Sequence, residues 1–266
     1  MNTSRRVLLT LEYDGTAYAG WQRQENALAI QQVVEDALEE LTGESIVITG
    51  ASRTDAGVHA MGQNAHFDTH SSIPDEKFSF ALNTMLSTDI RVRKSESAAA
   101  DFHARFSAVG KVYRYRIHRA PHASAIERNT AAHVIYPLDL DLMAREAQSM
   151  LGTHDFTAFA ASGSEAKTTV RTMRSIAVRA RGERVEIWIE GDGFLYNMVR
   201  ILAGTLIGVG SGKLPPGAIT RAIETRDRLQ LGVTAPPHGL TLMRVCYDDR
   251  AVGEYFALAL EENYLK

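Results

Sequence analysis

The chain of 266 residues contains a single cysteine, Cys246. One thiol excludes an internal disulfide framework and any metal site built from several thiolates. Cys246 lies in the stretch LTLMRVCYDD, where a cysteine usually serves as a small buried hydrophobic residue. No apolar run is long enough to cross a bilayer, and the charged-then-apolar beginning of the chain is too short for a signal peptide. We therefore expect a cytoplasmic protein with no membrane partner.

Acidic residues are missing or scarce in two stretches, although the formal net charge of the chain is −3. Between Asp101 and Glu127 there is no acid, and between Lys167 and Arg184 there is one, Glu183. The cations of the first stretch are Arg105, Lys111, Arg114, Arg116 and Arg119. Segregated charge of this kind indicates either a basic binding surface or solvated strand faces, and charge alone leaves both interpretations open.

The order of the hydrophobic patterns predicts two halves that repeat one succession of elements. In the first half, alternation predicts strands at 5–13, 45–50, 63–69 and 89–97, and helical spacing predicts helices at 30–41 and 74–86. In the second half, strands are expected at 111–119, 171–180, 183–190 and 240–249, and helices at 138–152, 194–209 and 215–225. Residues 254–266 fit either a closing helix or a tail.

The predicted fold class is α/β of the α+β type. We expect two related β-α-β-β-α-β-like halves with mostly antiparallel sheets around a central cleft. The N-terminal half is assigned to residues 1–108 and the C-terminal half to residues 109–266. A site between two sheet-bearing halves suits a large ligand.

The stretch GVGSGK resembles a phosphate-binding loop only superficially. Ile207 stands where that motif needs its first glycine, and Leu214 follows the lysine where the motif needs Ser or Thr. The glycines are instead expected to end the preceding helix.

Histidines are the remaining candidates for metal ligands. His59, His66, His70 and His103 lie within or close to predicted strands, with Asp68 nearby. The chain has no His-Glu-x-x-His pair on a helix and no cysteine ligand to accompany them. No metal and no cofactor are expected.

The stretch ASRTDAGVHA places Asp55 among small residues directly after an apolar run. The ordinary explanation is a turn aspartate that binds its own backbone. The alternative is a catalytic carboxylate, because Arg53 and Thr54 crowd the same turn and the alanines and glycines leave room for a ligand. Such a carboxylate can act as a nucleophile, and it needs a cationic partner to stay ionised once water is excluded.

Arg200 is a candidate for that partner. It lies in NMVRILAGTLIGV, which is apolar almost all round, so its charge must reach solvent or meet an anion. Asn197, Arg200, Gly204 and Gly208 form one polar-to-small stripe along the predicted helix. The stripe is either exposed or lines the cleft opposite Asp55.

The stretch KVYRYRIHR interleaves aromatic and basic residues. Alternation puts Tyr113 and Tyr115 on one face of the predicted strand and Arg114 and Arg116 on the other. Rings that stack on bases and cations that bind phosphates are what single-stranded or extruded nucleotides require. The alternative is an amphipathic strand with its tyrosines in the core.

Taken together, these stretches resemble the bacterial tRNA pseudouridine synthase A family, the TruA family. The blocks EYDGTAYAGWQRQ, SRTDAGVHA, DFHARFSA, KVYRYRI, GFLYNMVR and GLTLMRV are similar to those of the family and follow its order. The resemblance spans about residues 5–250. Ser52 departs from the pattern, because glycine is common before Arg-Thr-Asp, and Tyr196-Asn197 also differ from other members.

The resemblance implies an isomerase that converts uridine to pseudouridine at positions 38, 39 and/or 40 of the tRNA anticodon stem-loop. It implies a homodimer that works without a cofactor. Asp55 falls on the catalytic aspartate, Tyr113 on the tyrosine that stacks on the target base, and Arg200 on the arginine that pairs with the aspartate. Arg53 is expected to bind substrate, and Arg105, Lys111, Arg114 and Arg116 are expected to bind RNA.

Two alternatives stay open at this point. The first is a non-catalytic RNA-binding protein on the same fold, which needs the basic stretches and Tyr113 but has no use for an ionised Asp55. The second is a metal-dependent hydrolase, which needs the histidines and loses activity to a chelator. The route of the isomerisation is also open among attack on C1′, addition at C6 and abstraction of a sugar proton.

Overall fold

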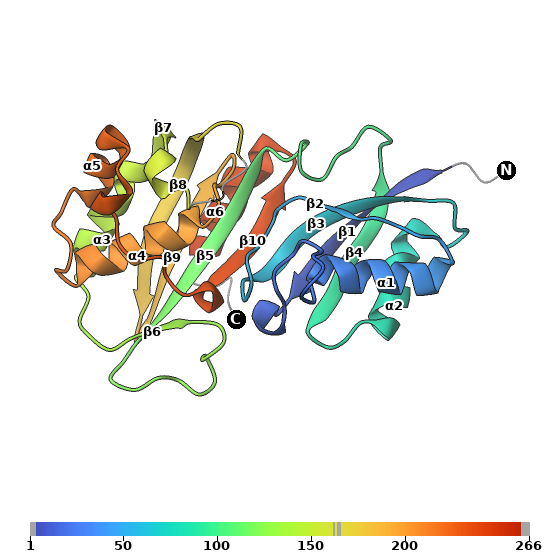
Figure 1. Cartoon of the computed structure of the whole chain (residues 1–266), viewed down its shortest axis with the longest axis horizontal. Coiled ribbons are helices and arrows are strands. Elements are labelled where there is room, and N and C mark those ends of the chain that lie inside the picture. The colour runs from blue at the N-terminus through green and yellow to red at the C-terminus, as the bar shows by residue number, and fades with distance from the viewer. Residues whose placement is uncertain (1–3, 162, 164–165, 262–266) are drawn as a thin grey trace. The chain divides into compact units, whose positions relative to one another are not determined.

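The computed structural model describes residues 4–161, 163 and 166–261, and within them the mixed α/β class is confirmed. The chain divides into two compact units (Figure 1). Unit 1 comprises the residues up to Val109 together with Leu242–Tyr247, and unit 2 comprises Gly110–Thr241 and the residues from Asp248 onward. The assignment of domains to 1–108 and 109–266 stays a prediction, from which these units differ by grouping Leu242–Tyr247 with the first.

Unit 1 has a mainly antiparallel sheet with its two α-helices packed together, and its element order agrees with the predicted β-α-β-β-α-β pattern. Its elements are β1 (Arg5–Tyr13), α1 (Ile30–Thr42), β2 (Thr49–Gly50), β3 (His59–Thr69), α2 (Phe78–Met85), β4 (Ile90–Ala98) and most of β10 (Leu240–Cys246). The strands follow the order β4-β1-β3-β10, and β2 pairs with β3. Alternate residues of β1 are fully buried, as are the apolar residues of α1 and α2 that form the core with them: Val7, Leu9, Leu11, Ile30, Val34, Leu38, Phe78 and Leu82.

The strand predicted at 45–50 is wrong for most of its length, because only β2 has strand geometry. Ile46 and Ile48 are buried and Val47 is exposed, so the alternation of the sequence reflects real burial. The backbone of Ile48 is bonded to helix α1 instead of to a neighbouring strand. Its N–H donates to Glu35 Oε1 at 3.0 Å, and its carbonyl accepts from Gln31 Nε2 at 3.1 Å.

Unit 2 has an antiparallel sheet in the order β5-β9-β8-β7, to which β6 adds in parallel with β5. Its elements are β5 (Gly110–Arg119), β6 (Ala132–Val134), α3 (Leu140–Ala147), β7 (Gly152–Asp155), β8 (Val170–Arg181), β9 (Arg184–Gly191), α4 (Met198–Gly210), α5 (Ala218–Thr225) and α6 (Asp249–Leu260). Helices α3, α4 and α5 contact one another (Figure 1). The open question at the C-terminus is answered by α6, which is helical from Asp249 to Leu260.

Helix α4 begins four residues later than predicted, at Met198, because Asn197 adopts a left-handed conformation with φ 60°. Its end agrees with the expectation for GVGSGK. The helix stops at Gly210, and Gly212 has φ 74°, a conformation that suits glycine at a helix C-terminus. These glycines terminate a helix and form no phosphate-binding loop. Of the helices among the described residues, none is long and apolar enough to span a bilayer.

A short turn of unit 1, Phe102–Ser107, is tied to the body of the unit by side chains from three other segments. The Ala104 N–H donates to His66 Nδ1 at 3.1 Å, and the Ala104 carbonyl accepts from the Tyr247 hydroxyl at 2.9 Å. The Phe102 carbonyl accepts from Arg6 at 2.6 Å. Burial of His66, with the positive charge of Arg6 as a smaller cause, lowers the pKa of that imidazole to about 4. The neutral ring is therefore a hydrogen-bond acceptor for the turn.

The lowered pKa of His66 predicts a specific loss of stability in weak acid. Between pH 6.5 and 4 the unfolded chain binds a proton at this histidine that the folded protein excludes, so the free energy of unfolding falls as the pH is lowered. The variant His66→Asn keeps an acceptor but does not titrate. Urea unfolding between pH 6.5 and 4.5 should show a flatter dependence in the variant, by at most about 1.4 kcal/mol per pH unit. An identical pH dependence in both proteins would contradict a neutral buried His66.

Candidate active site

Asp55 lies in the loop Ala51–Val58 between β2 and β3, in unit 1. The Val58 N–H donates to the Asp55 carbonyl at 3.1 Å, which closes a β-turn with Gly57 at its third position. Gly57 has φ 75°, as a type II turn requires there. Arg53 is exposed and Asp55 half-buried, whereas Thr54 between them is buried. The turn thus presents the carboxylate at the surface of unit 1.

The loop is fastened to the segment Tyr13–Trp21 by hydrogen bonds from both backbones and side chains. The Trp21 N–H donates to the Thr54 carbonyl at 3.0 Å, and the Gly57 N–H donates to the Tyr18 carbonyl at 3.3 Å. The Tyr13 hydroxyl and the Thr54 hydroxyl are 2.8 Å apart. Asp55 is therefore flanked on both sides by residues whose positions are fixed.

Two glycines of that segment allow the loop backbone to approach it closely. A methyl group at Gly20 would lie 2.4 Å from the Thr54 carbonyl oxygen and 3.0 Å from the Asp55 carbonyl carbon. A methyl group at Gly15 would lie 2.0 Å from the Val58 carbonyl oxygen. Gly20 also has φ 92°, which other residues rarely adopt. Only glycine fits at either position without displacing the loop that carries Asp55.

These supporting residues were not assigned any role from the sequence. The block EYDGTAYAGWQRQ was part of the family resemblance. Nothing in the sequence indicated that its two glycines would pack against the loop of Asp55. The loop also binds β3, where the amide of Gln63 accepts from the Ser52 N–H and donates to the Ser52 carbonyl. Gln63 is completely buried, but Asn64 and His66 on the same strand are buried too, so the sequence pattern did not single it out.

Ser52 and the small residues of the loop have local structural explanations. Ser52 is not among the described residues with positive φ, so the serine costs no backbone strain where family members have glycine. Ala51 is completely buried, and Gly57 supplies the positive φ of the turn. Clearance for a nucleotide is thus not needed to explain these residues.

Arg200 lies in the first turn of α4 in unit 2 and is half-buried. Its Nε donates to the Ala235 carbonyl at 2.9 Å, and its Nη1 donates to Asn197 Oδ1 at 2.7 Å. The Ala235 N–H in turn donates to the Arg200 carbonyl at 3.1 Å. The guanidinium is therefore held in one orientation by neutral acceptors.

The second half of the predicted stripe along α4, which contains Gly204 and Gly208, is neither exposed nor part of a cleft. A methyl group at Gly204 would lie 1.8 Å from the Val233 carbonyl oxygen, and one at Gly208 would lie 2.8 Å from the Leu214 side chain. The small residues of the stripe let these neighbours pack directly on the helix. Only the Asn197–Arg200 end of the stripe keeps its polar character.

Tyr113 and Tyr115 lie on one face of β5 in unit 2. Tyr113 is buried on β5, and its ring meets Phe194 edge-on at a centroid distance of 5.0 Å. Tyr115, two residues along the same strand face, donates its hydroxyl to the Pro236 carbonyl at 2.9 Å. Burial raises the pKa of Tyr115, and the nearby charge of Arg200 acts against that shift. Unit 2 thus gathers two of the predicted site residues, while Asp55 and Arg53 belong to unit 1.

The arginine face of β5 differs from the expected RNA-binding surface. Arg114 is buried, with its guanidinium 5.6 Å from the centre of the Trp188 ring and 3.8 Å from Glu186. Arg116 forms a closer ion pair with Glu186, at 3.3 Å. Burial lowers the pKa of Arg114 to about 10, so it remains charged at neutral pH. Both arginines serve the packing of this sheet face, whereas Lys111 is half-buried and Arg105 is exposed.

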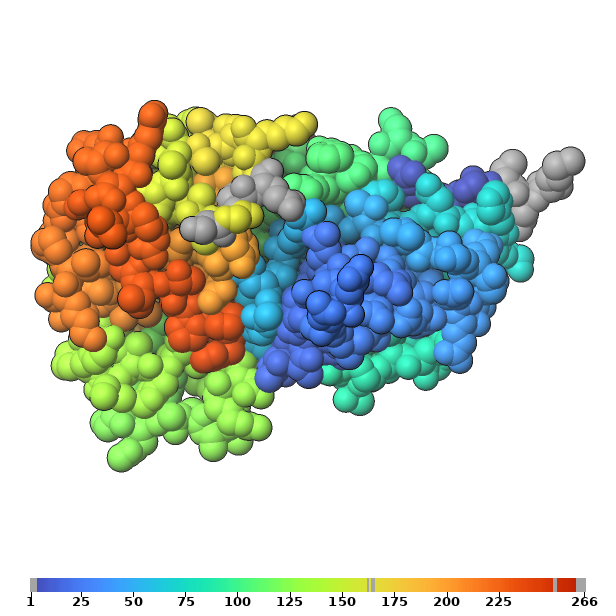
Figure 2. Space-filling view, in the orientation of Figure 1, coloured from blue at the N-terminus to red at the C-terminus, as the bar shows by residue number. Residues whose placement is uncertain are grey.

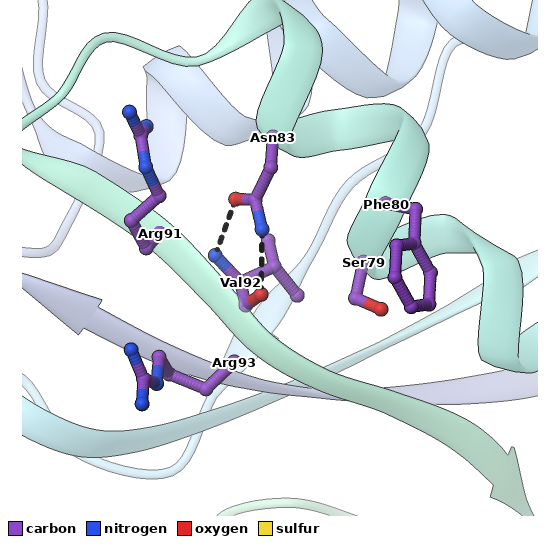
Figure 3. A pocket seen from close by; sticks show the side chains of 6 residues that line it. All are labelled: Ser79, Phe80, Asn83, Arg91, Val92 and Arg93. Carbon is purple, nitrogen blue, oxygen red and sulfur yellow. Dashed lines mark hydrogen bonds between the residues drawn. The ribbon is translucent and has the colours of Figure 1, made fainter.

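A separate pocket of about 270 Å³ lies in unit 1 between α2 and β4 (Figure 3). Ser79, Phe80 and Asn83 line it from the helix, and the neighbouring residues Arg91, Val92 and Arg93 line it from the strand. The Asn83 amide binds both the N–H and the carbonyl of Val92, so this residue joins the two elements. Asp55 is not part of the pocket. Among the described residues, no group of three or more His, Cys, Asp or Glu is arranged to hold a metal ion.

The close approach at Gly20 predicts a large cost for a single methyl group. Gly20→Ala should lower the free energy of unfolding by about 2–4 kcal/mol, from positive φ and from overlap with the Thr54 carbonyl. Gly43→Ala is the matched control, because Gly43 has φ 71° but no atom within 4 Å of the added methyl group. The control should cost about 1 kcal/mol in urea unfolding. Equal costs for the two variants would show that the loop yields freely at Gly20.

Comparison with known proteins gives one consistent result. The family described as "tRNA pseudouridine synthase" matches residues 10–107 and 147–248. The proteins named "tRNA pseudouridine synthase A" from Acetivibrio thermocellus and Ruminiclostridium cellulolyticum are 51% and 50% identical to this chain, over 91% of the chain and 100% of each relative. The protein of that name from Caldicellulosiruptor bescii is 46% identical over the same shares.

One solved structure, titled "Crystal Structure of a Cbf5-Nop10-Gar1 Complex", aligns with 96% of this chain and 58% of that chain, with a TM-score of 0.37 and 11% sequence identity. The match of the family over most of the chain and the identity to relatives covered from end to end are sufficient. This chain belongs to the tRNA pseudouridine synthase family.

Proposed function

We propose that this protein is an isomerase that converts uridine to pseudouridine in the anticodon stem-loop of tRNA, at positions 38, 39 and/or 40. One observation carries the proposal. In a chain half identical to proteins named tRNA pseudouridine synthase A, a partly exposed carboxylate stands on a turn whose backbone is fixed on both sides.

The reaction needs no external reagent. The N1–C1′ glycosidic bond of uridine breaks, the uracil turns, and C5 bonds to C1′. C5 loses its proton to solvent, and the freed N1 takes up one proton. All other atoms are retained, so substrate and product have the same mass. The base must first leave its stack, at a cost of a few kcal/mol that is lowest in loops and weak stems.

Asp55 is the proposed catalytic nucleophile. Its carboxylate must sit within reach of the sugar or the base, and a misplacement of about 1 Å costs about a hundredfold in rate. The hydrogen bonds at Thr54 and Gly57 and the close approach at Gly20 restrict that movement. Arg53, exposed two residues earlier, is proposed to bind the substrate backbone.

Tyr113 and Arg200 are proposed to complete the site. Tyr113 supplies the ring for the extruded uracil, and Arg200 keeps Asp55 anionic after water is excluded. Support for the Arg200 role comes from its guanidinium, which hydrogen bonds to the Ala235 carbonyl and to Asn197 hold in a defined orientation. Tyr113 is supported by its place on β5, where its ring packs edge-on against Phe194, four residues before the start of the helix that carries Arg200.

Among the candidate RNA-binding cations, Lys111 and Arg105 are retained. Arg114 is buried and shares Glu186 with the half-buried Arg116, and arginines already paired with a carboxylate are weaker candidates for binding a phosphate. The protein is further proposed to act in the cytoplasm as a homodimer, as its family resemblance implies. No cofactor or metal is assigned.

The central experiment measures tritium release from tRNA labelled at uracil C5, with a chelator present. We expect release without any change in RNA mass. No release from any tRNA would overturn the enzymatic proposal, and binding without release would favour a non-catalytic RNA-binding protein. A change in RNA mass that depends on added metal would favour a metal-dependent hydrolase.

The variant Asp55→Asn tests whether the Asp55 carboxylate carries out the reaction. The variant should bind tRNA like the wild type but release tritium at least about 10³-fold more slowly. Asp36→Asn, which changes an exposed aspartate on α1 in the same unit, is the control and should retain full activity. If Asp55→Asn kept more than about a tenth of the wild-type rate, another group would have to be the nucleophile.

A further inference from the structure

Five aromatic rings of unit 1 form a continuous chain of contacts that ends at the surface. Tyr247 meets Phe102 at a centroid distance of 4.8 Å, Phe102 meets His66 at 6.3 Å, and His66 meets His103 at 4.9 Å. The last pair, His103 and Phe106, is the closest at 4.2 Å, with an angle of 33° between the ring planes. The Phe106 side chain at the end of this chain is 77% exposed.

An exposed phenylalanine is ordinary on a mobile loop, but the turn Phe102–Ser107 is held firmly. Besides the bonds from Arg6, His66 and Tyr247, His103 Nδ1 accepts from the N–H groups of Arg105 and Phe106 at 3.2 and 3.3 Å. The Ser107 hydroxyl accepts from the His103 N–H at 3.0 Å. Phe106 is thus a ring fixed in one place, with one face on His103.

The neighbour of Phe106 gives the surface its charge. The Arg105 guanidinium carbon lies 5.8 Å from the centre of the Phe106 ring, and both side chains are exposed. The chain has no acid from Phe102 to Ile126. The segment between β4 and β5 that contains these residues lies at the surface of unit 1 (Figures 1 and 2). A fixed ring beside a cation can stack on a base and bind its phosphate, which is the chemistry of single-stranded RNA contacts.

The turn that carries Phe106 contacts β3 at a different position from the one at which the Asp55 loop joins this strand. The loop enters β3 at His59, and the ring chain touches the same strand at His66, seven residues further. At about 3.3 Å per residue, these positions are about 23 Å apart. The turn Phe102–Ser107 thus contacts β3 well away from the end of the strand that the Asp55 loop enters, so Phe106 and Arg105 are expected to act on binding of the RNA and not on the reacting uridine.

We propose that Phe106 and Arg105 form a nucleotide-stacking platform, at which a base of the RNA substrate stacks on Phe106 while Arg105 binds a phosphate. This proposal depends on the proposed function, because it takes tRNA as the ligand of the platform. It is a second RNA-contact site, distinct from Asp55 and Tyr113. The turn that carries it belongs to the sequence stretch DFHARFSA. The two histidines beneath it position the ring and do not contact the ligand.

The first test compares tRNA affinity for Phe106→Ala and a matched control. Phe80→Ala removes another exposed ring of unit 1 with a cation beside it, Lys77 at 5.4 Å, from the α2–β4 pocket of Figure 3. Phe106→Ala should raise the Kd for tRNA about tenfold or more, and the loss in turnover should fall on KM. Phe80→Ala should leave Kd within twofold. Arg105→Gln should weaken binding less and lower the salt slope of log K by about one unit.

The second test reads the stacking itself through Phe106→Trp. The two native tryptophans, Trp21 and Trp188, are buried, so an exposed indole at position 106 dominates any change on binding. The variant should bind tRNA with near wild-type affinity, and its fluorescence should be quenched at saturation. Affinity rescued by tryptophan but not by alanine is expected only of a stacking role.

The outcomes separate this proposal from that of the reaction, because Kd is measured without turnover. If no tritium is released but Phe106→Ala still weakens tRNA binding, the platform stands and the enzymatic proposal fails. An unchanged Kd for Phe106→Ala, an equal loss for Phe80→Ala, or no quenching in Phe106→Trp would overturn the platform. So would a Phe106→Ala protein that binds tRNA normally but loses self-association in sedimentation, because the surface would then be a protein contact.

Discussion

The close approach of two backbone segments, Gly15–Gly20 and Thr54–Val58, is the constraint on which the candidate site depends. Side chains larger than hydrogen at Gly15 or Gly20 would overlap carbonyl groups of the loop. The contact lets the Trp21 N–H and the Tyr18 carbonyl bond to the loop backbone, which leaves the Asp55 side chain as the group that the turn presents. A reaction that rebuilds a glycosidic bond needs such a carboxylate at a defined place, because position governs the rate of covalent steps.

Hydrogen bonds also fix the orientation of individual groups in unit 2 and at the turn that carries Phe106. Arg200 is oriented by Ala235 and Asn197, and the turn Phe102–Ser107 is oriented by acceptor histidines. In each case hydrogen bonds to neighbouring residues fix the orientation of the group in advance. The overall charge of the chain is slightly negative, so the proposed RNA binding depends on local contacts of this kind.

Periodicity in the sequence predicted the longer helices and strands of both units, because their buried faces repeat regularly, but it did not predict the short strands β6 and β7. It failed at 45–50, where Glu35 and Gln31 replace a strand neighbour, and at the start of α4, where Asn197 takes a left-handed conformation. Alternation correctly predicted that Tyr113 and Arg114 lie on opposite faces of β5. It did not indicate that Arg114 would be buried and paired with Glu186. Long-range contacts such as Gly20 with Thr54 leave no local pattern, so the support of Asp55 was visible only in the structure.

The position of the Asp55 carboxylate, and not only its charge, is the central claim. Asp55→Glu keeps the charge and moves the carboxylate outward by one methylene group on the same turn. The direct measurement is the single-turnover rate of tritium release at saturating tRNA. The account predicts a loss of about a hundredfold or more, with the Kd for tRNA unchanged. A rate within about threefold of the wild type would contradict it, because the fixed turn would then not determine the chemistry.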